Sequence, residues 1–196
     1  MSRYGLAVGA AALAFFVAPG QARATSMLYQ DLSALTQSSD AVVHGTVKKT
    51  ESRWSGDHQR IVTEVSIDVS EFIKGRGAKT VVVLQPGGEV GGIGQKISGL
   101  ASFAEGEEVV LFLERRGAEK YRVAGMAQGK YRVERSSDKT AAFAVPESTG
   151  DAMVIDPQTS EPVQVDRQPM DLTAFKAKVR VAAKAAPGGA QRKKSP

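Results

Sequence analysis

The sequence predicts an all-β domain, mainly antiparallel, with one helix near each end of the folded part. Three observations support this fold class. Apolar and polar residues alternate over short segments, turn signals recur roughly every ten residues, and helical spacing appears only towards the two ends. Strands without helices between them exclude a parallel α/β sheet, which leaves an antiparallel barrel or sandwich. A roughly five-stranded Greek-key barrel with added strands fits the pattern best.

Residues 1–24 have the features of a secretory signal peptide. Arg3 precedes an apolar run from Gly5 to Val17, and a small-x-small site, Ala22-Arg23-Ala24, follows it. The run is shorter than the about 20 residues that a membrane-spanning helix needs, so we expect cleavage after Ala24. The protein would then be exported to the periplasm or the extracellular space. The chain contains no cysteine, so the predicted domain, residues 25–170, depends on its apolar core alone.

The net charge of +5 is distributed unevenly along the chain. The predicted domain is mildly acidic, whereas a predicted amphipathic helix, residues 171–186, and a polar tail, residues 187–196, are basic. An acidic body does not favour nucleic-acid binding, because phosphate contacts need basic side chains on the folded surface. A weak contact with an anionic surface is the partner interaction that this segment allows. It would involve Lys176, Arg180, Lys184, Arg192, Lys193 and Lys194.

Each element is predicted from its own pattern. Apolar spacing predicts a short helix over Met27–Ser38 with Ser26 as its N-cap. Strands are predicted at residues 41–47, 61–70, 79–85, 95–98, 109–113, 120–124, 129–135 and 140–145, with a brief pairing at 153–155. Gly45 indicates a bulge or a tight bend, and the strands at 120–124 and 129–135 are expected to form a hairpin. Asp171 caps the second helix, whose stripe of Leu172, Phe175 and Val179 would dock on the barrel and leave the lysines in water.

The strand at Val109–Leu113 is the one around which the others are expected to be arranged. Its residues are apolar without a break, and it lies between a turn at Gly106 and a charged turn at residues 114–117. A continuous apolar strand indicates burial on both faces. Glu105, Glu107 and Glu108, which flank the first turn, are expected to be solvated charges that keep this strand soluble.

Several of these segments also carry a family resemblance. Asp40–Val47, Thr63–Val69, Phe72–Gly75, Thr80–Val83 and Phe103–Leu113 resemble a pattern seen in secreted bacterial proteins of unknown function. The same order is similar to the netrin-like modules of metalloprotease inhibitors, which are OB-fold barrels. The resemblance covers about residues 40–133 and implies an OB-like Greek-key barrel. Netrin-like inhibitors act through an N-terminal cysteine that binds the target's metal, and this chain has no cysteine to do so.

The motifs that signal particular chemistry are incomplete. The glycine-rich connection at residues 86–94 lacks both the Gly-Lys-Ser/Thr of a phosphate loop and the third glycine of a dinucleotide fingerprint. It is expected to be a flexible loop that could form the rim of a binding surface. His44 and His58 have no local partner at the spacing of a zinc site, and no nucleophile motif is present. We therefore assign no catalytic residue, metal ligand or cofactor.

The candidate partner-binding residues are Arg53, Trp54, His58, Tyr121 and Tyr131. Trp54 lies on a polar loop and would either contact a partner or fold back over the open end of the barrel. Tyr121 and Tyr131 would form a platform on paired strands or belong to the core. The function expected is an exported, non-catalytic module whose loops and sheet edge bind a protein or an envelope component. The alternatives are a hydrolase of envelope polymers and a structural protein tethered electrostatically to the envelope.

Overall fold

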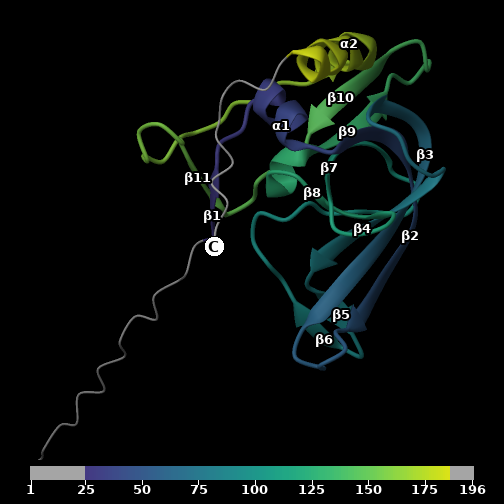
Figure 1. Cartoon of the computed structure of the whole chain (residues 1–196), viewed down its shortest axis with the longest axis vertical. Helices are drawn as coiled ribbons and strands as arrows, with labels where there is room; N and C mark the ends of the chain where they lie inside the picture. Colours follow the sequence, from purple (N-terminus) through teal and green to yellow (C-terminus); the bar gives the residue numbers. More distant parts are fainter. Residues whose placement is uncertain (1–24, 186–196) are drawn as a thin grey trace, which may run out of the picture.

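Five strands close into a barrel in the computed structural model, which describes residues 25–185 (Figure 1). The barrel strands are β2 (Ala41–Trp54), β3 (Ile61–Lys74), β4 (Thr80–Pro86), β7 (Glu108–Arg115) and β8 (Lys120–Val123). β2 pairs with β3 and β7, β3 pairs with β4, and β8 closes the ring between β4 and β7. The β4–β8 pairing is parallel and the others are antiparallel. The predicted OB-like barrel is thus confirmed.

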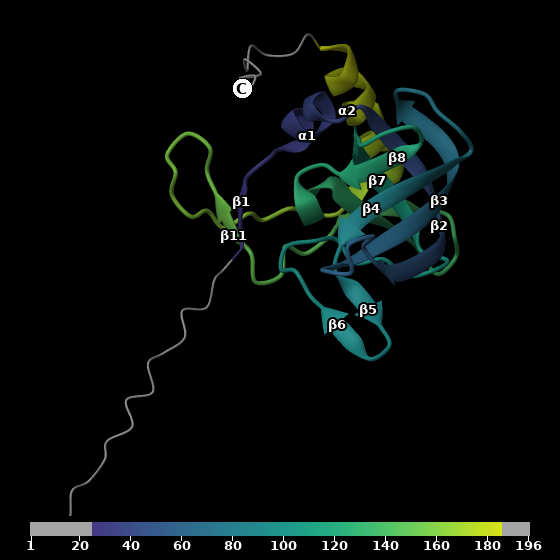
Figure 2. The same cartoon turned by 60° about the horizontal axis from the view of Figure 1, so that its bottom comes forward.

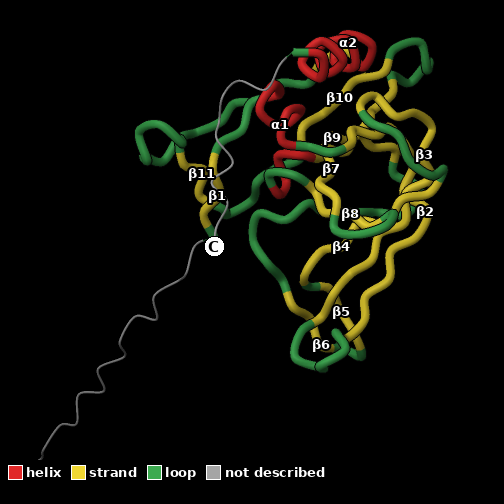
Figure 3. The backbone as a smooth tube through the Cα atoms, in the orientation of Figure 1, coloured by secondary structure: helices red, strands yellow, loops and turns green. Residues whose placement is uncertain are grey.

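The other elements surround this barrel. They are β1 (Ser26–Leu28), α1 (Leu32–Ser38), β5 (Gly88–Val90), β6 (Ile93–Gln95), the 3₁₀ helix η1 (Met126–Gly129), β9 (Lys130–Arg135), β10 (Ala142–Pro146), β11 (Met153–Ile155), β12 (Met170–Asp171) and α2 (Leu172–Lys184). β9, β10 and β12 extend the barrel sheet outward from β7, while β5 and β6 form a separate hairpin. Figure 3 shows both α-helices at one end of the molecule and this hairpin at the other. Among residues 25–185, no helix is long and apolar enough to cross a membrane.

β7 is buried on both faces, as predicted. Val109, Leu111 and Leu113 pack inside the barrel, whereas Val110 and Phe112 belong to a second apolar cluster that includes residues of α2. All five side chains have no exposed surface. The position of the strand explains this burial, because one face of β7 lines the barrel core and the other lies under α2, while β2, β8 and β9 pair along its edges. A continuous apolar sequence is what such a site requires.

α2 covers the outer face of this sheet through the predicted stripe. Leu172, Phe175 and Val179 are buried, and the ring of Phe175 packs edge-on against Phe112 with 6.3 Å between centroids. Asp171 accepts a hydrogen bond from the backbone N–H of Ala174 at 2.9 Å and so caps the helix. The docking of this helix on the barrel is confirmed. The predicted signal peptide, residues 1–24, and the predicted tail, residues 187–196, lie outside the described residues.

Strand pairing overrides the sequence pattern in three places. The first helix begins at Leu32 with Asp31 as its N-cap, because Ser26–Leu28 pairs as a parallel strand with β11 instead. β8 and β9 do not form the predicted hairpin, since each pairs with a different half of β7. The predicted loop from residue 48 is also wrong up to Trp54, where β2 ends. The bulge at Gly45 is confirmed by a register shift, and a Cβ there would lie 2.4 Å from the carbonyl oxygen of Asp68.

Candidate binding cleft

The glycine-rich connection forms one wall of a cleft at an end of the barrel. Its residues fold into the β5–β6 hairpin, whose two turn residues, Gly91 and Gly92, have φ of 59° and 78°. Positive φ at both positions defines the two-residue turn that suits the twist of a hairpin. The connection is therefore an ordered hairpin and not the flexible loop that its composition predicts. Figure 2 shows this hairpin projecting from the barrel, beside the segment that leads away from β6.

Glycine allows the hairpin to lie against the β2–β3 ribbon. A Cβ on Gly88, whose φ is 125°, would lie 2.3 Å from the hydroxyl oxygens of both Ser52 and Thr63. Real Cβ atoms do not approach other atoms so closely, so a larger residue would push the hairpin away from the ribbon. The sequence signal for this contact is the Gly87-Gly88 pair that follows Pro86 at the end of β4.

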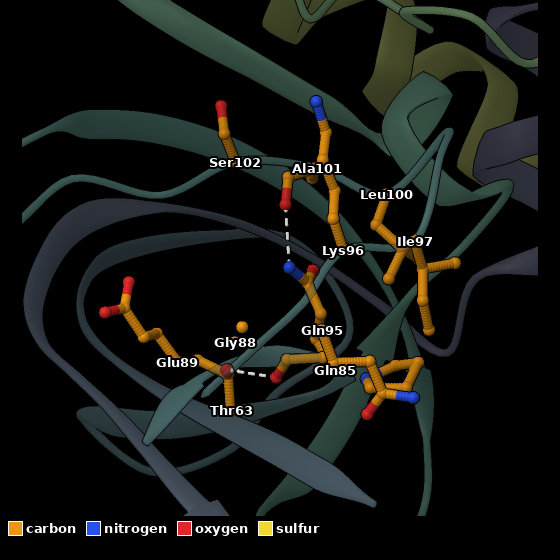
Figure 4. Close-up of a pocket in the computed structure, with 13 residues that line it drawn as sticks. Thr63, Gln85, Gly88, Glu89, Gln95, Lys96, Ile97, Leu100, Ala101 and Ser102 are labelled. Atoms are coloured by element: carbon orange, nitrogen blue, oxygen red, sulfur yellow. Dashed lines mark hydrogen bonds between the residues drawn. The ribbon is translucent and has the colours of Figure 1, made fainter. Parts of the chain in front are cut away.

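The cleft has a volume of about 570 Å³ and runs between the hairpin and residues 96–102 (Figure 4). Hydrogen bonds from side chains to backbone hold its walls. Gln85 Nε2 donates to the carbonyl oxygen of Ala101 at 2.8 Å, and Thr63 Oγ1 donates to that of Gly87 at 2.6 Å. Ile97 and Leu100 supply apolar surface, and the two charged residues of the lining are Glu89 and Lys96. The lining is thus mixed, with amide, hydroxyl and apolar groups close together.

A buried lysine fixes the segment that leaves the cleft. The side chain of Lys130 in β9 is 1% exposed, and its Nζ lies 2.8 Å from Glu107 Oε1 and 3.3 Å from Glu147 Oε2. The same ammonium donates to the carbonyl oxygen of Ser102 and lies 4.9 Å from the centre of the Phe103 ring. The Lys130 ammonium therefore links residues 102–107 to β9 and to the residue that follows β10. Glu107 is not the solvated charge that its position beside a turn predicts.

Three of the predicted site residues come together at the tip of the β2–β3 ribbon. Trp54 is the last residue of β2, is half-buried, and pairs with Ile61. Arg53 is exposed and forms an ion pair with Glu64 at 2.7 Å. His58 is exposed in the turn that joins the two strands, with φ of 55°. These residues lie at the same end of the ribbon, as their proximity in the sequence predicts, with Arg53 and Trp54 on opposite faces of β2.

Of the two alternatives for Tyr121 and Tyr131, the structure favours the core and not the surface platform. Tyr121 has no exposed surface and lies inside the barrel, while Tyr131 is 7% exposed and packs between Phe112 and Phe175. The two rings belong to different apolar clusters and face different parts of the core. Strand alternation explains this result, because Arg122 and Arg132 occupy the positions that point outward. Neither tyrosine can contact a partner on the surface.

A polar cluster that sequence reasoning missed joins α2 to the barrel. Lys176 Nζ donates to His44 Nδ1 at 2.9 Å and to Glu71 Oε2 at 2.8 Å, and His44 Nε2 donates to Glu108 Oε1 at 2.8 Å. Arg180 also binds Glu71. Lys176, with 15% of its side chain exposed, is therefore engaged with the protein itself, which corrects the prediction that it stays in water, whereas Arg180 keeps 46% of its side chain exposed. The partners come from β2, β3, β7 and α2, so no local sequence signal could have grouped them.

The electrostatics of this cluster follow from its burial and its pairs. Burial lowers the pKa of His44 below its ordinary value, even though the hydrogen bond to Glu108 acts in the opposite direction. The hydrogen bond from Lys176 lowers the pKa of Glu71. Burial would raise the pKa of Glu108, but the hydrogen bonds from Arg135 and His44 outweigh it and lower the pKa. The cluster thus favours a neutral His44 between an ammonium and two carboxylates.

Comparison with models of known protein families and with characterised proteins gave no match to this chain. Among residues 25–185, no three His, Asp or Glu side chains converge so that they could hold a metal ion.

Proposed function

We propose that the protein is an exported binding module, which holds part of another protein or of an envelope component in the cleft at the end of its barrel. The observation that carries this proposal is the cleft of about 570 Å³, whose walls are set by hydrogen bonds from Gln85 and Thr63. Ligand sites are concave, largely pre-formed and lined by apolar surface with a few placed polar groups. The β5–β6 hairpin, an ordered connection on a closed barrel, gives the cleft such a pre-formed wall.

The ribbon tip extends the proposed surface beyond the cleft. Ser52 and Trp54 are two residues apart in β2, so they lie on the same face of the strand. Gly88 of the hairpin lies against Ser52 on that face. Trp54 is therefore on the side of the ribbon that carries the hairpin, where a large, rigid aromatic side chain would add contact area for a partner.

The two alternatives have less support. A hydrolase of envelope polymers would need carboxylates or histidines placed to reach a substrate. Among the described residues, Glu107 and Glu147 are turned to Lys130, and His44 is held by Lys176 of α2 while His58 lies at the ribbon tip. Electrostatic tethering would have to do without Lys176 and Arg180, which are bound to Glu71. Arg192, Lys193 and Lys194 lie outside the described residues.

Affinity capture with the chain from Thr25 onward, against the secreted and envelope fractions of its source, tests the proposal. Ile97→Asp places a charge in the cleft, and Val181→Asp makes the same kind of change on α2, where Val181 is 70% exposed. We expect a partner that is retained by the Val181 variant and lost by the Ile97 variant. Weaker capture by Trp54→Ala would extend the surface to the ribbon tip. A partner that the Ile97 variant also retains, or no partner for a folded chain, would contradict the proposal.

A further inference from the structure

The outer edge of β6 is open and unprotected. Among residues 25–185, β6 pairs with β5 alone, and all three of its residues are exposed, including 57% of Ile93. Natural proteins usually protect such an edge with a charged side chain, a proline or a bulge, because unpaired backbone groups recruit other strands. β6 is short, at three residues, but Ile93-Gly94-Gln95 carries no charged side chain, proline or bulge. An open edge with an exposed isoleucine is typical of a surface that pairs with another strand.

The register of the hairpin shows which backbone groups face the open edge. The turn at Gly91 and Gly92 closes on the Val90–Ile93 pair, which is followed by Glu89–Gly94 and Gly88–Gln95. A two-residue turn closes on a hydrogen-bonded pair, and such pairs alternate with non-hydrogen-bonded ones along an antiparallel ladder. Glu89–Gly94 is therefore a non-hydrogen-bonded pair. The N–H and C=O of Gly94 point away from β5, towards the open edge.

The surroundings of Gly94 leave room for another chain. A Cβ built on Gly94 would have no atom within 4 Å, so the face of β6 at this residue is uncovered. Gly94, Gln95 and Lys96 all line the cleft, which places the cleft next to this edge. Successive side chains of a strand point to opposite faces. A strand paired with β6 would therefore direct alternate side chains towards the cleft, where Gln85, Ile97 and Leu100 lie.

We propose that β6 binds an extended polypeptide segment of the partner as a third strand of the hairpin, with two backbone hydrogen bonds at Gly94 and one partner side chain in the cleft. This inference rests on the proposed function and names the chemistry of its ligand. An outward N–H and C=O on one residue match the backbone of an opposing residue in an added strand, and Ile93 offers an apolar cross-strand contact. A polysaccharide has no regular amide donors to match this edge.

Peptides selected from a displayed random library on the chain from Thr25 onward provide the test, with affinities measured by fluorescence polarisation. Gly94→Pro removes the N–H donor at the open edge, whereas Gly94→Ala keeps it and has space for its methyl group. We expect Gly94→Pro to weaken binding by about tenfold or more, because a lost hydrogen bond also leaves its acceptor unpaired. Gly94→Ala should change the affinity by less than about threefold.

A second readout avoids the risk that proline disturbs the hairpin. In the unsubstituted chain, hydrogen exchange at the Gly94 amide should become slower when peptide is bound. Peptides that bind Gly94→Pro as well as the original chain, an unchanged exchange rate at Gly94, or a library that yields no peptide would overturn strand addition. So would pairing of two copies of this chain through β6, seen by sedimentation. If peptides ignore Gly94→Pro but are lost with Ile97→Asp, the cleft still binds and only the strand addition is wrong.

Discussion

Replacement of Lys130 by methionine tests whether the wall of the cleft is fixed by a buried charge. Methionine keeps the apolar stem and removes the ammonium, so Glu107 and Glu147, whose side chains are 17% and 13% exposed, lose their shared partner. Removal of one member of a buried pair costs about 3–5 kcal/mol. The free energy of unfolding of a domain is about 5–15 kcal/mol, so this cost is a large part of the total.

Thermal and urea unfolding, followed by circular dichroism, measure the effect. For a chain of this size, about 2–4 °C of Tm per kcal/mol converts the cost into a Tm lower by about 6–20 °C. The matched control is Arg122→Met, because Arg122 pairs with Glu114 on the surface with 51% of its side chain exposed. Its cost should stay under about 1 kcal/mol. Equal decreases in the free energy of unfolding for the two variants would refute this reasoning, because they would show that the ion pairs of Lys130 contribute no more than an ion pair on the surface.

Three further predictions concern the barrel and the helix α2 that packs on it. The pKa values of His44 and Glu108 are lowered in the folded state, so this state binds fewer protons than the unfolded chain, and the urea midpoint should fall as pH decreases from 7 to 4. Phe175→Ala, which empties the space between α2 and β7, should cost about 3–5 kcal/mol in urea unfolding. Gly45→Ala should lower Tm, because its Cβ would lie 2.4 Å from the carbonyl oxygen of Asp68.

Each of these predictions has a result that would contradict it. A urea midpoint that stays constant from pH 7 to pH 4 would mean that the charges around His44 do not differ between the folded and unfolded states. A loss below about 1 kcal/mol for Phe175→Ala would show that α2 contributes little to the core. An unchanged Tm for Gly45→Ala would mean that the bulge in β2 accepts a side chain without adjustment.

Local periodicity predicted the parts of the fold whose burial follows from one segment alone. The unbroken apolar sequence of Val109–Leu113 was sufficient to place β7 in the centre, and the stripe on α2 was sufficient to predict its docked face. The first helix was predicted too long because Ser26–Leu28 pairs with β11, more than 100 residues away in the sequence. Pairing of distant segments overrides local spacing and leaves no local signal.

The candidate site could be predicted only in part for the same reason. The tip residues Arg53, Trp54 and His58 are neighbours in the sequence, so their proximity was predictable. The cleft is formed when the glycine-rich hairpin lies against Ser52 and Thr63, a contact between segments more than 20 residues apart. The glycines can be seen in the sequence, but the glycine-rich composition of residues 86–94 alone predicts a flexible loop. The φ values show instead that they allow an ordered turn and a close contact.

The cleft and the edge of β6 together form the proposed binding surface. Hydrogen–deuterium exchange on the chain from Thr25 onward, with and without the captured partner, tests it most directly. We predict slower exchange in residues 88–102 and at the ribbon tip around Trp54, with no change in α2. Slower exchange confined to α2 or to the edge formed by β10 and β12, with residues 88–102 unchanged, would contradict the account.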